Sequence, residues 1–273
     1  MAAKSDPKPT HDERVISVED VRELSVRPGK PPVLFFDGDK GGIGKSTLAS
    51  VFADFLVKSG VPTAVVDADN RNPDVSRMFS NVVPTINANL RQHEGWMDLT
   101  DFLISQADRV IVVSLPAGIG EHFEKEATQF FNTIAQLGRE ASVFWLMDRV
   151  SDCVNLFARS QKVVGSRMKA SIVVKNLFRG DADKFGDWDN SETRKAFDQA
   201  GGLTINLTEL NWRARAKLLA DHTNVMPFSN ALVPIVEAAR SPHGLTPSEN
   251  MELDEWLRVN HGTFERLRSV IGL

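Results

Sequence analysis

A glycine-rich segment near the start of the chain constrains the fold more than any other feature. Residues 36–47 read FDGDKGGIGKST and lie between an apolar run, Val33–Asp37, and an amphipathic stretch that begins at Lys45. Glycines permit a tight turn in which backbone N–H groups converge, and the N-terminus of a following helix adds positive charge. The pattern predicts a loop that binds a chain of phosphates between a strand and a helix.

The residue types within this loop predict separate roles. Gly41, Gly42 and Gly44 give the backbone its freedom and allow phosphates to approach closely. Lys45 is placed to reach the β- and γ-phosphates, and the Ser46 hydroxyl to bind Mg²⁺. A surface turn that happens to be rich in Gly and Lys is the alternative.

The loop matches a variant form of the phosphate-binding motif. Asp39 stands where G-x-x-x-x-G-K-[ST] requires its first glycine, whereas K-G-G-x-G-K-[ST] fits, with an additional lysine at position 40. This variant resembles the deviant Walker A motif of the ParA/MinD family of dimerising P-loop ATPases, whose members position plasmids, chromosomes, division proteins and other cargo. The resemblance implies that ATP and Mg²⁺ bind here, and that Lys40 is a catalytic residue that reaches across a nucleotide-sandwich dimer to the partner's phosphates. The residues expected to contact the nucleotide are Gly41, Gly42, Ile43, Gly44, Lys45, Ser46 and Thr47.

Two acidic residues lie at the end of the next predicted strand, Thr63–Asp67. Asp67 is the last residue of the strand and Asp69 comes two residues later, an arrangement that resembles the family's second motif. The resemblance implies that Asp69 is a catalytic residue that orients the attacking water and that Asp67 lies near the metal. The alternative is that both carboxylates only cap the following turn.

The third motif departs from the family pattern. Residues 109–118, RVIVVSLPAG, resemble a strand that ends in Asp-x-Pro-Ala/Pro-Gly, but Ser114 stands in place of the Walker B aspartate. Because serine has no negative charge to hold the water shell of Mg²⁺, we expect weaker metal binding, or help from Asp67, and slow or partner-dependent hydrolysis. A nucleotide-dependent scaffold without turnover stays open.

A later predicted strand, Ser171–Asn176, ends where family members place an asparagine beside the base. The resemblance implies that Asn176 contacts the nucleotide and that Pro227 and Phe228 form another wall of that pocket. The alternative is that Asn176 is a turn residue, a common role for asparagine at the end of a strand.

From Val33 onward, short apolar runs alternate with longer amphipathic stretches, which is typical of βα units. We predict an α/β fold with a doubly wound, mostly parallel sheet of the P-loop NTPase type, whose ligand lies at the carboxyl ends of the strands. A flexible N-terminal arm is expected over residues 1–30, the ATPase domain over 31–247 and a C-terminal helical extension over 248–273. The strands are predicted at Val33–Asp37, Thr63–Asp67, Arg109–Leu115, Ser142–Met147, Ser171–Asn176 and Leu203–Leu207, and the helices at Lys45–Ser59, Met97–Ser105, Glu121–Leu137, Asp152–Val164, Ser191–Ala200, Asn211–Ala220 and, as a pair or one element, Ser248–Val270.

The composition argues against several classes of protein. The chain has 273 residues, with 32 Lys and Arg against 36 Asp and Glu, which argues against a surface that binds nucleic acid all over. No run approaches the roughly 20 apolar residues that cross a bilayer. A single cysteine, Cys153, excludes an intrachain disulfide, and the first residues lack the apolar segment of a signal peptide, so we expect a cytoplasmic protein.

Two surfaces are candidates for contact with a partner. Arg213, Arg215 and Lys217 would give non-specific DNA binding, although such cations on an amphipathic helix commonly form only a solvated face. The tail from Phe264 to Leu273 resembles a short amphipathic membrane anchor, and its alternative is an ordinary last helix packed on the domain. The apolar residues on one face of this tail are Phe264, Leu267, Val270 and Ile271.

These observations predict a ParA/MinD-like ATP-binding protein that forms an ATP-dependent homodimer and hydrolyses ATP weakly. The resemblance implies a role in DNA or plasmid segregation, maintenance or transfer, with an activating protein as a further partner. A membrane- or cargo-positioning ATPase and a scaffold with little hydrolysis are the alternatives.

Overall fold

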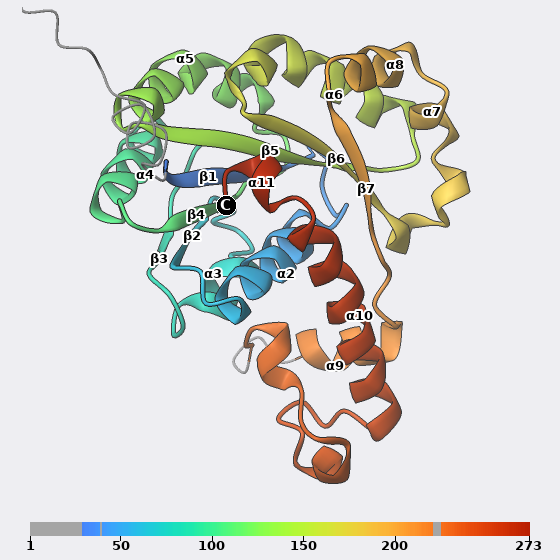
Figure 1. Cartoon of the computed structure of the whole chain (residues 1–273). Coiled ribbons are helices and arrows are strands. Elements are labelled where there is room, and N and C mark those ends of the chain that lie inside the picture. The colour runs from blue at the N-terminus through green and yellow to red at the C-terminus, as the bar shows by residue number, and fades with distance from the viewer. Residues whose placement is uncertain (1–28, 39, 221–224) are drawn as a thin grey trace, which may run out of the picture.

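A seven-stranded parallel sheet forms the centre of the computed structural model (Figure 1), with the strand order β3-β2-β4-β1-β5-β6-β7. The structure describes residues 29–38, 40–220 and 225–273. Nearly all of the expected arm over residues 1–30, and Asp39, therefore lie outside the described residues. The strands are β1 Lys30–Asp37, β2 Thr63–Asp67, β3 Thr85–Asn87, β4 Val110–Ser114, β5 Arg139–Met147, β6 Ala170–Asn176 and β7 Leu203–Leu207.

Helices cover both faces of this sheet (Figure 1). One layer contains α2 Lys45–Lys58, α3 Asp74–Phe79, α9 Trp212–Leu219, α10 Pro247–Glu265 and α11 Arg268–Ile271. The other contains α4 His93–Ser105, α5 Gly120–Gln136, α6 Ser151–Val164, α7 Gly186–Asp189 and α8 Glu192–Gln199. Short 3₁₀ turns include Leu177–Arg179 after β6, and Phe228–Ala231 and Ile235–Arg240 before α10. The predicted doubly wound α/β fold is confirmed.

The predicted strands and helices are all present, with shifts at their ends. Three short elements were not predicted. Strand β3 has three residues at the edge of the sheet and is only partly buried, α3 has six residues and α7 has four. None of them is long enough to show a periodic apolar pattern. The last predicted helix is a pair, α10 and α11, separated by Arg266 and Leu267.

Strand β1 lies at the middle of the sheet because both of its faces are apolar. Leu34 and Phe36 pack with α2 on one side, and Val33 and Phe35 pack with α5 on the other. All four side chains are fully buried. A strand covered on both faces reads as a continuous apolar run, which is how a central parallel strand is recognised.

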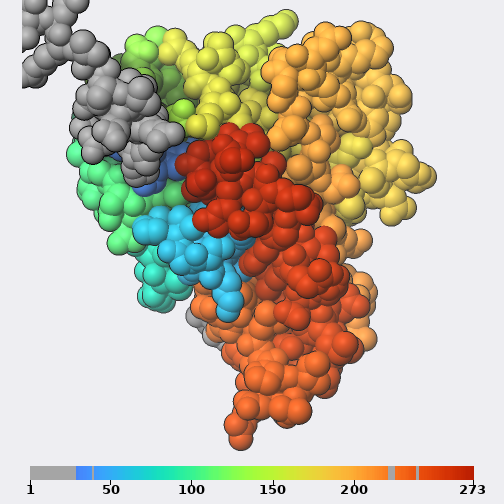
Figure 2. Space-filling view, viewed as in Figure 1, coloured from blue at the N-terminus to red at the C-terminus, as the bar shows by residue number. Residues whose placement is uncertain are grey.

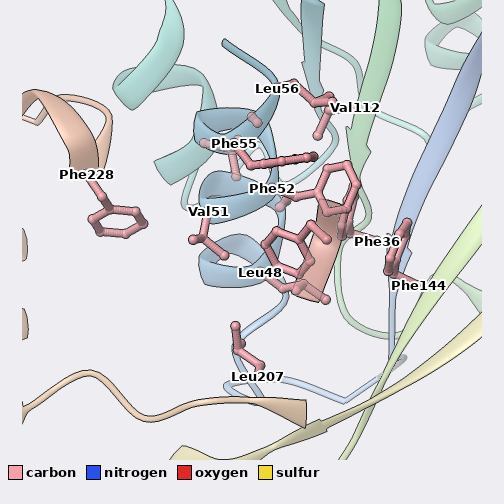
Figure 3. Close-up of a cluster of buried hydrophobic side chains, with 14 of the residues drawn as sticks. Phe36, Leu48, Val51, Phe52, Phe55, Leu56, Val112, Phe144, Leu207 and Phe228 are labelled. Atoms are coloured by element: carbon pink, nitrogen blue, oxygen red, sulfur yellow. The ribbon is translucent and has the colours of Figure 1, made fainter. Parts of the chain in front are cut away.

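The C-terminal helices complete the core on the α2 side. In Figure 2 the C-terminal segment, in red, lies against α2, in light blue. The ring of Phe264 on α10 lies 4.7 Å from that of Phe52 on α2, and Phe52 in turn lies 4.9 Å from Phe144 on β5. Figure 3 shows side chains of α2 directed at Phe36 and Phe144, which stack at 5.0 Å. Helix α10 is therefore part of the wall that holds α2, the helix that follows the glycine-rich loop.

The apolar face of the C-terminal tail is covered by this core. Phe264, Leu267 and Ile271 are buried among the side chains of α2 and the sheet. The packed-helix alternative is confirmed. No described helix combines the length and apolar character needed to cross a membrane.

Candidate nucleotide-binding site

The glycine-rich loop runs from the end of β1 to the start of α2, at the carboxyl edge of the sheet. Gly42 and Gly44 have positive φ angles of 69° and 99°. A β-carbon at Gly44 would also lie 2.6 Å from Nδ2 of Asn176. Both the backbone conformation and the space thus require glycine at position 44.

Asn176, at the end of β6, braces this loop. Its Nδ2 donates to the carbonyl oxygen of Ile43 at 2.6 Å, and its Oδ1 accepts from the backbone N–H of Phe178 at 3.2 Å. The side chain is buried and also lines the cavity described below. Asn176 was predicted to contact the nucleotide. The structure shows in addition that it contacts the glycine-rich loop, which the sequence did not predict.

The two lysines of the motif have different surroundings. Lys45 is buried, and its Nζ donates to the backbone oxygen of Lys40 at 2.5 Å. Lys40 is more exposed, and its Nζ lies 3.8 Å from Asp152 Oδ2 at the start of α6. Lys45 is among the described residues that line the cavity, and Lys40 is not.

Asp67, at the end of β2, is buried and bonded to the backbone that follows it. Its Oδ1 accepts from the N–H of Asp69 at 3.1 Å, and its Oδ2 accepts from those of Val75 and Ser76 at 2.9 and 3.1 Å, in the first turn of α3. Burial raises the pKa of Asp67 to about 6, although these hydrogen bonds act in the opposite direction. Asp67 thus fixes the start of α3, as the capping alternative expects, and its carboxyl group is poised between charged and neutral forms near pH 6.

Asp69 lies further out and lines the cavity. Its Oδ1 accepts from the backbone N–H groups of Arg71 and Asn72 at 3.1 and 3.2 Å. These bonds orient the carboxylate and leave its second oxygen for another partner.

Ser114 ends β4, in register with Asp67 on β2 and Phe36 on β1. Its side chain is buried, so the position of the Walker B aspartate is filled by a small neutral group beside Asp67. Arg91 holds the loop that follows β4, because its guanidinium donates to the carbonyl oxygens of Ala117 and Gly118.

A cavity of about 280 Å³ joins these elements. Its lining includes the polar glycine-rich loop, Asp69 and Asp74. It also includes apolar side chains, among them Phe228, which the sequence predicted as a wall of this pocket. The full lining is Gly41, Gly42, Ile43, Gly44, Lys45, Ser46, Thr47, Asp69, Asn72, Asp74, Leu115, Ala117, Asn176, Phe178, Leu207, Thr208, Leu210, Arg215, Leu219, Phe228 and Trp256.

The residues predicted to bind DNA do not share one environment. Arg213 Nε and Lys217 Nζ pair with the buried carboxylate of Glu249 on α10, at 3.2 and 2.6 Å. Arg215 instead lines the cavity, with its guanidinium 4.5 Å from the centre of the Phe178 ring. Sequence reasoning therefore placed Arg215 on α9 correctly but missed its position at the cavity.

The donor atoms in the cavity suit Mg²⁺ with a nucleotide. Ser46, Asp69 and Asp74 offer hydroxyl and carboxylate oxygens, the ligands that this hard cation prefers alongside phosphate and water. Among the described residues, no group of three or more His, Cys, Asp or Glu side chains is arranged to hold a metal by itself.

Comparisons with known proteins show the family of the chain. The family model described as the CobQ/CobB/MinD/ParA nucleotide binding domain matches residues 34–194, more than half of the chain. Protein MobD of Acidithiobacillus ferrooxidans is 26% identical over 179 residues, which is 65% of this chain and 78% of MobD.

Solved structures include proteins of similar shape but low identity. The MinD cell division protein of Aquifex aeolicus has a TM-score of 0.46 at 15% identity, over 85% of this chain and 97% of that one. Chloroplast FtsY of Physcomitrella patens has a TM-score of 0.48 at 11% identity, over 83% of this chain and 65% of that one. On the extent of the family-model match, which includes the glycine-rich loop and Asn176, the chain belongs to the family of CobQ/CobB/MinD/ParA nucleotide-binding domains.

Proposed function

We propose that this protein binds ATP with Mg²⁺ in the cavity beside the glycine-rich loop and uses the nucleotide to control its own dimerisation. The observation that carries the proposal is the cavity itself. It brings the loop amides, Lys45, Ser46 and Asp69 together at the carboxyl edge of a parallel sheet, where such folds bind their ligands.

The chain's own residues divide the work of binding. The amides of residues 41–47 and the N-terminus of α2 hold the phosphates, with Lys45 among the residues lining the same cavity. Ser46 and Asp67 are assigned to Mg²⁺, which would neutralise charge on the β- and γ-phosphates when it is bound. Asp69 orients a water molecule with the carboxylate oxygen that its backbone bonds leave available.

Lys40 is assigned to the partner's site. Its side chain is partly exposed and, among the described residues, is not part of the lining of its own cavity. A lysine in that position can reach a phosphate held by a second copy of the chain without leaving its place in the loop. Dimerisation would then require ATP, because the γ-phosphate is the group that a second cation stabilises.

Hydrolysis is expected to be slow. Ser114 supplies no charge at the end of β4, and Asp67 already accepts three backbone hydrogen bonds. The site therefore favours holding ATP over cleaving it. An activating protein, a cytoplasmic location and a setting in DNA or plasmid segregation, maintenance or transfer remain part of this proposal, on the strength of the family. DNA contact through Arg213, Arg215 and Lys217 stays a prediction.

The experiment that tests the proposal measures oligomeric state against nucleotide. We expect the wild type to elute as a dimer with a non-hydrolysable ATP analogue and Mg²⁺, and as a monomer with ADP, in size-exclusion chromatography with light scattering. Lys40→Ala should bind the analogue but stay monomeric, since only its contact with the second copy is removed. Lys58→Ala, at the far end of α2, is the control and should behave as wild type.

The same samples report on turnover. With Mg-ATP the wild type should release phosphate slowly, and Asp69→Asn should bind ATP equally well but release none. A wild type that binds no nucleotide would overturn the proposal as a whole. Identical elution of wild type and Lys40→Ala in every condition would overturn the role given to Lys40.

A further inference from the structure

Arg215 has no anionic partner within the described part of the chain, although it lies between two cations that have one. Its neighbours on α9, Arg213 and Lys217, both pair with Glu249. The Arg215 guanidinium instead lies over the ring of Phe178, half-buried in the wall of the nucleotide cavity. A guanidinium presents five N–H donors in a plane, and here the ring covers one face of that plane.

The position of Phe178 connects this pair to the phosphate-binding loop. The backbone N–H of Phe178 donates to Asn176 Oδ1, and the other end of the Asn176 amide holds Ile43. The loop, Asn176, Phe178 and Arg215 therefore form a continuous chain of contacts along the cavity.

The lining of the cavity suits both parts of a nucleotide. The loop is polar, rich in amides and holds Lys45, as a triphosphate requires. The lining that includes Arg215 also includes Leu207, Leu210 and Leu219, with Leu219 one turn from Arg215 on α9, and apolar walls with a few polar groups are typical of a subsite for a base and sugar. The guanidinium would supply the polar contact there.

Helix α9 is held so that Arg215 faces the cavity. Arg213 and Lys217 are four residues apart and share one face of the helix, where Glu249 fixes them to α10. Glu249 is itself held by the capping box at the start of α10, through Thr246. Arg215 lies on another face, together with Leu219, which also lines the cavity.

We propose that Arg215 contacts the nucleoside part of the bound nucleotide and that Phe178 positions it for this contact. The proposal rests on the proposed function, because it requires that a nucleotide occupy the cavity. It reassigns Arg215 from DNA to the nucleotide and gives α9, outside all of the motifs, a direct role in recognition.

The test compares ligands with and without a nucleoside, by calorimetric titration of the full chain. For Arg215→Met we expect the affinities for Mg-ATP and Mg-ADP to fall by the same factor, about tenfold, as for loss of one hydrogen bond to a charged group. The affinity for inorganic tripolyphosphate, which has no base or sugar, should not change. Arg258→Met on α10 is the matched control, because this side chain is 69% exposed, pairs with Glu255 and is not part of the described lining of the cavity; it should leave all three affinities as in wild type.

A second variant keeps the test valid if α9 is sensitive to substitution. Phe178→Leu removes the ring under the guanidinium, lies on a different element, and should weaken ATP and ADP by about threefold, again without effect on tripolyphosphate. An equal loss for tripolyphosphate, a loss confined to ATP, or no difference from Arg258→Met would each overturn the assignment. A wild type that binds tripolyphosphate but shows no gain from the nucleoside also overturns it, whereas failure to bind any of the three ligands overturns the proposed function.

Discussion

At the scale of single residues, Asp67 shows how one side chain serves the fold and the site together. Its carboxylate is buried at the end of β2 and holds the first turn of α3, and it lies in register with the neutral Ser114. Burial outweighs the backbone hydrogen bonds to this carboxylate and raises the pKa of Asp67 to about 6. In the absence of nucleotide and metal, ionising this group therefore costs stability.

The pH dependence of folding should reveal this cost. Below about pH 4 Asp67 is protonated in both states, and between about pH 4 and 6 the unfolded chain releases the proton while the folded chain keeps it, so stability falls as the pH rises. A shift from 3.8 to about 6 corresponds to roughly 3 kcal/mol. The difference in free energy of unfolding between wild type and Asp67→Asn, measured in urea without nucleotide or Mg²⁺, should fall by about this amount from pH 4 to 7. Parallel curves for the two proteins would contradict the raised pKa.

Residue roles were predictable where they depend on neighbours in sequence. Lys45 and Ser46 belong to a contiguous motif whose geometry is set by the strand and helix around it, and both line the cavity. Asn176 was predicted near the nucleotide, but its bond to Ile43 was not, because that contact joins residues far apart in the chain. Arg215 was predicted to contact DNA, with a solvated face as the alternative, because the sequence shows its charge and its helix but not which way α9 faces.

At the scale of elements, α2 depends on its neighbours on both sides. It carries Lys45 at its first residue, and it is held between the sheet and α10 by the aromatic rings of Phe52, Phe144 and Phe264. The stretches that follow Lys45 and Ser248 were predicted as helices, and they are α2 and α10. Their contact was not predictable, because nothing local to either helix specifies which surface its apolar face meets.

Removing one ring of this contact should destabilise the whole protein. Phe264 is fully buried, so Phe264→Ala should lower the free energy of unfolding by about 3–5 kcal/mol through lost contacts and a cavity. Met251→Ala on the same helix is the control, since that side chain is 56% exposed and its loss should cost less than about 0.5 kcal/mol. Chemical denaturation measures both, and equal effects of the two substitutions would show that α10 is not part of the core.

At the scale of the whole molecule, the cavity is assembled from distant parts of the chain. Its lining comes from the loop after β1, the segments after β2, β4, β6 and β7, and helices α9 and α10. The parallel sheet brings the strand ends to one edge, as the alternation of apolar and amphipathic segments predicted. The wall made by Trp256 of α10 was not predicted, because residues 248–273 were treated as an extension.

Ligand binding should therefore stabilise the entire fold. At a concentration of non-hydrolysable ATP analogue about 100 times its dissociation constant, with Mg²⁺ present, the folded state gains about 2.7 kcal/mol, which for a chain of this size raises the Tm by roughly 5–10 °C. Lys45→Ala should keep its own Tm unchanged by the same addition. The measurement is differential scanning calorimetry. A wild-type Tm that the analogue does not change would contradict binding in a cavity built from these distant parts of the chain.

The bond between Asn176 and Ile43 also bears on the order in which the molecule is made. The bracing amide is synthesised 133 positions after the loop that it supports, and β6 must first pair with β5 before Asn176 reaches its place. A nascent chain that has emerged only through α6 has every residue of the glycine motif but not the brace that shapes it. The contact between the glycine-rich loop and Asn176 can therefore form only after β6 has left the ribosome and paired with β5.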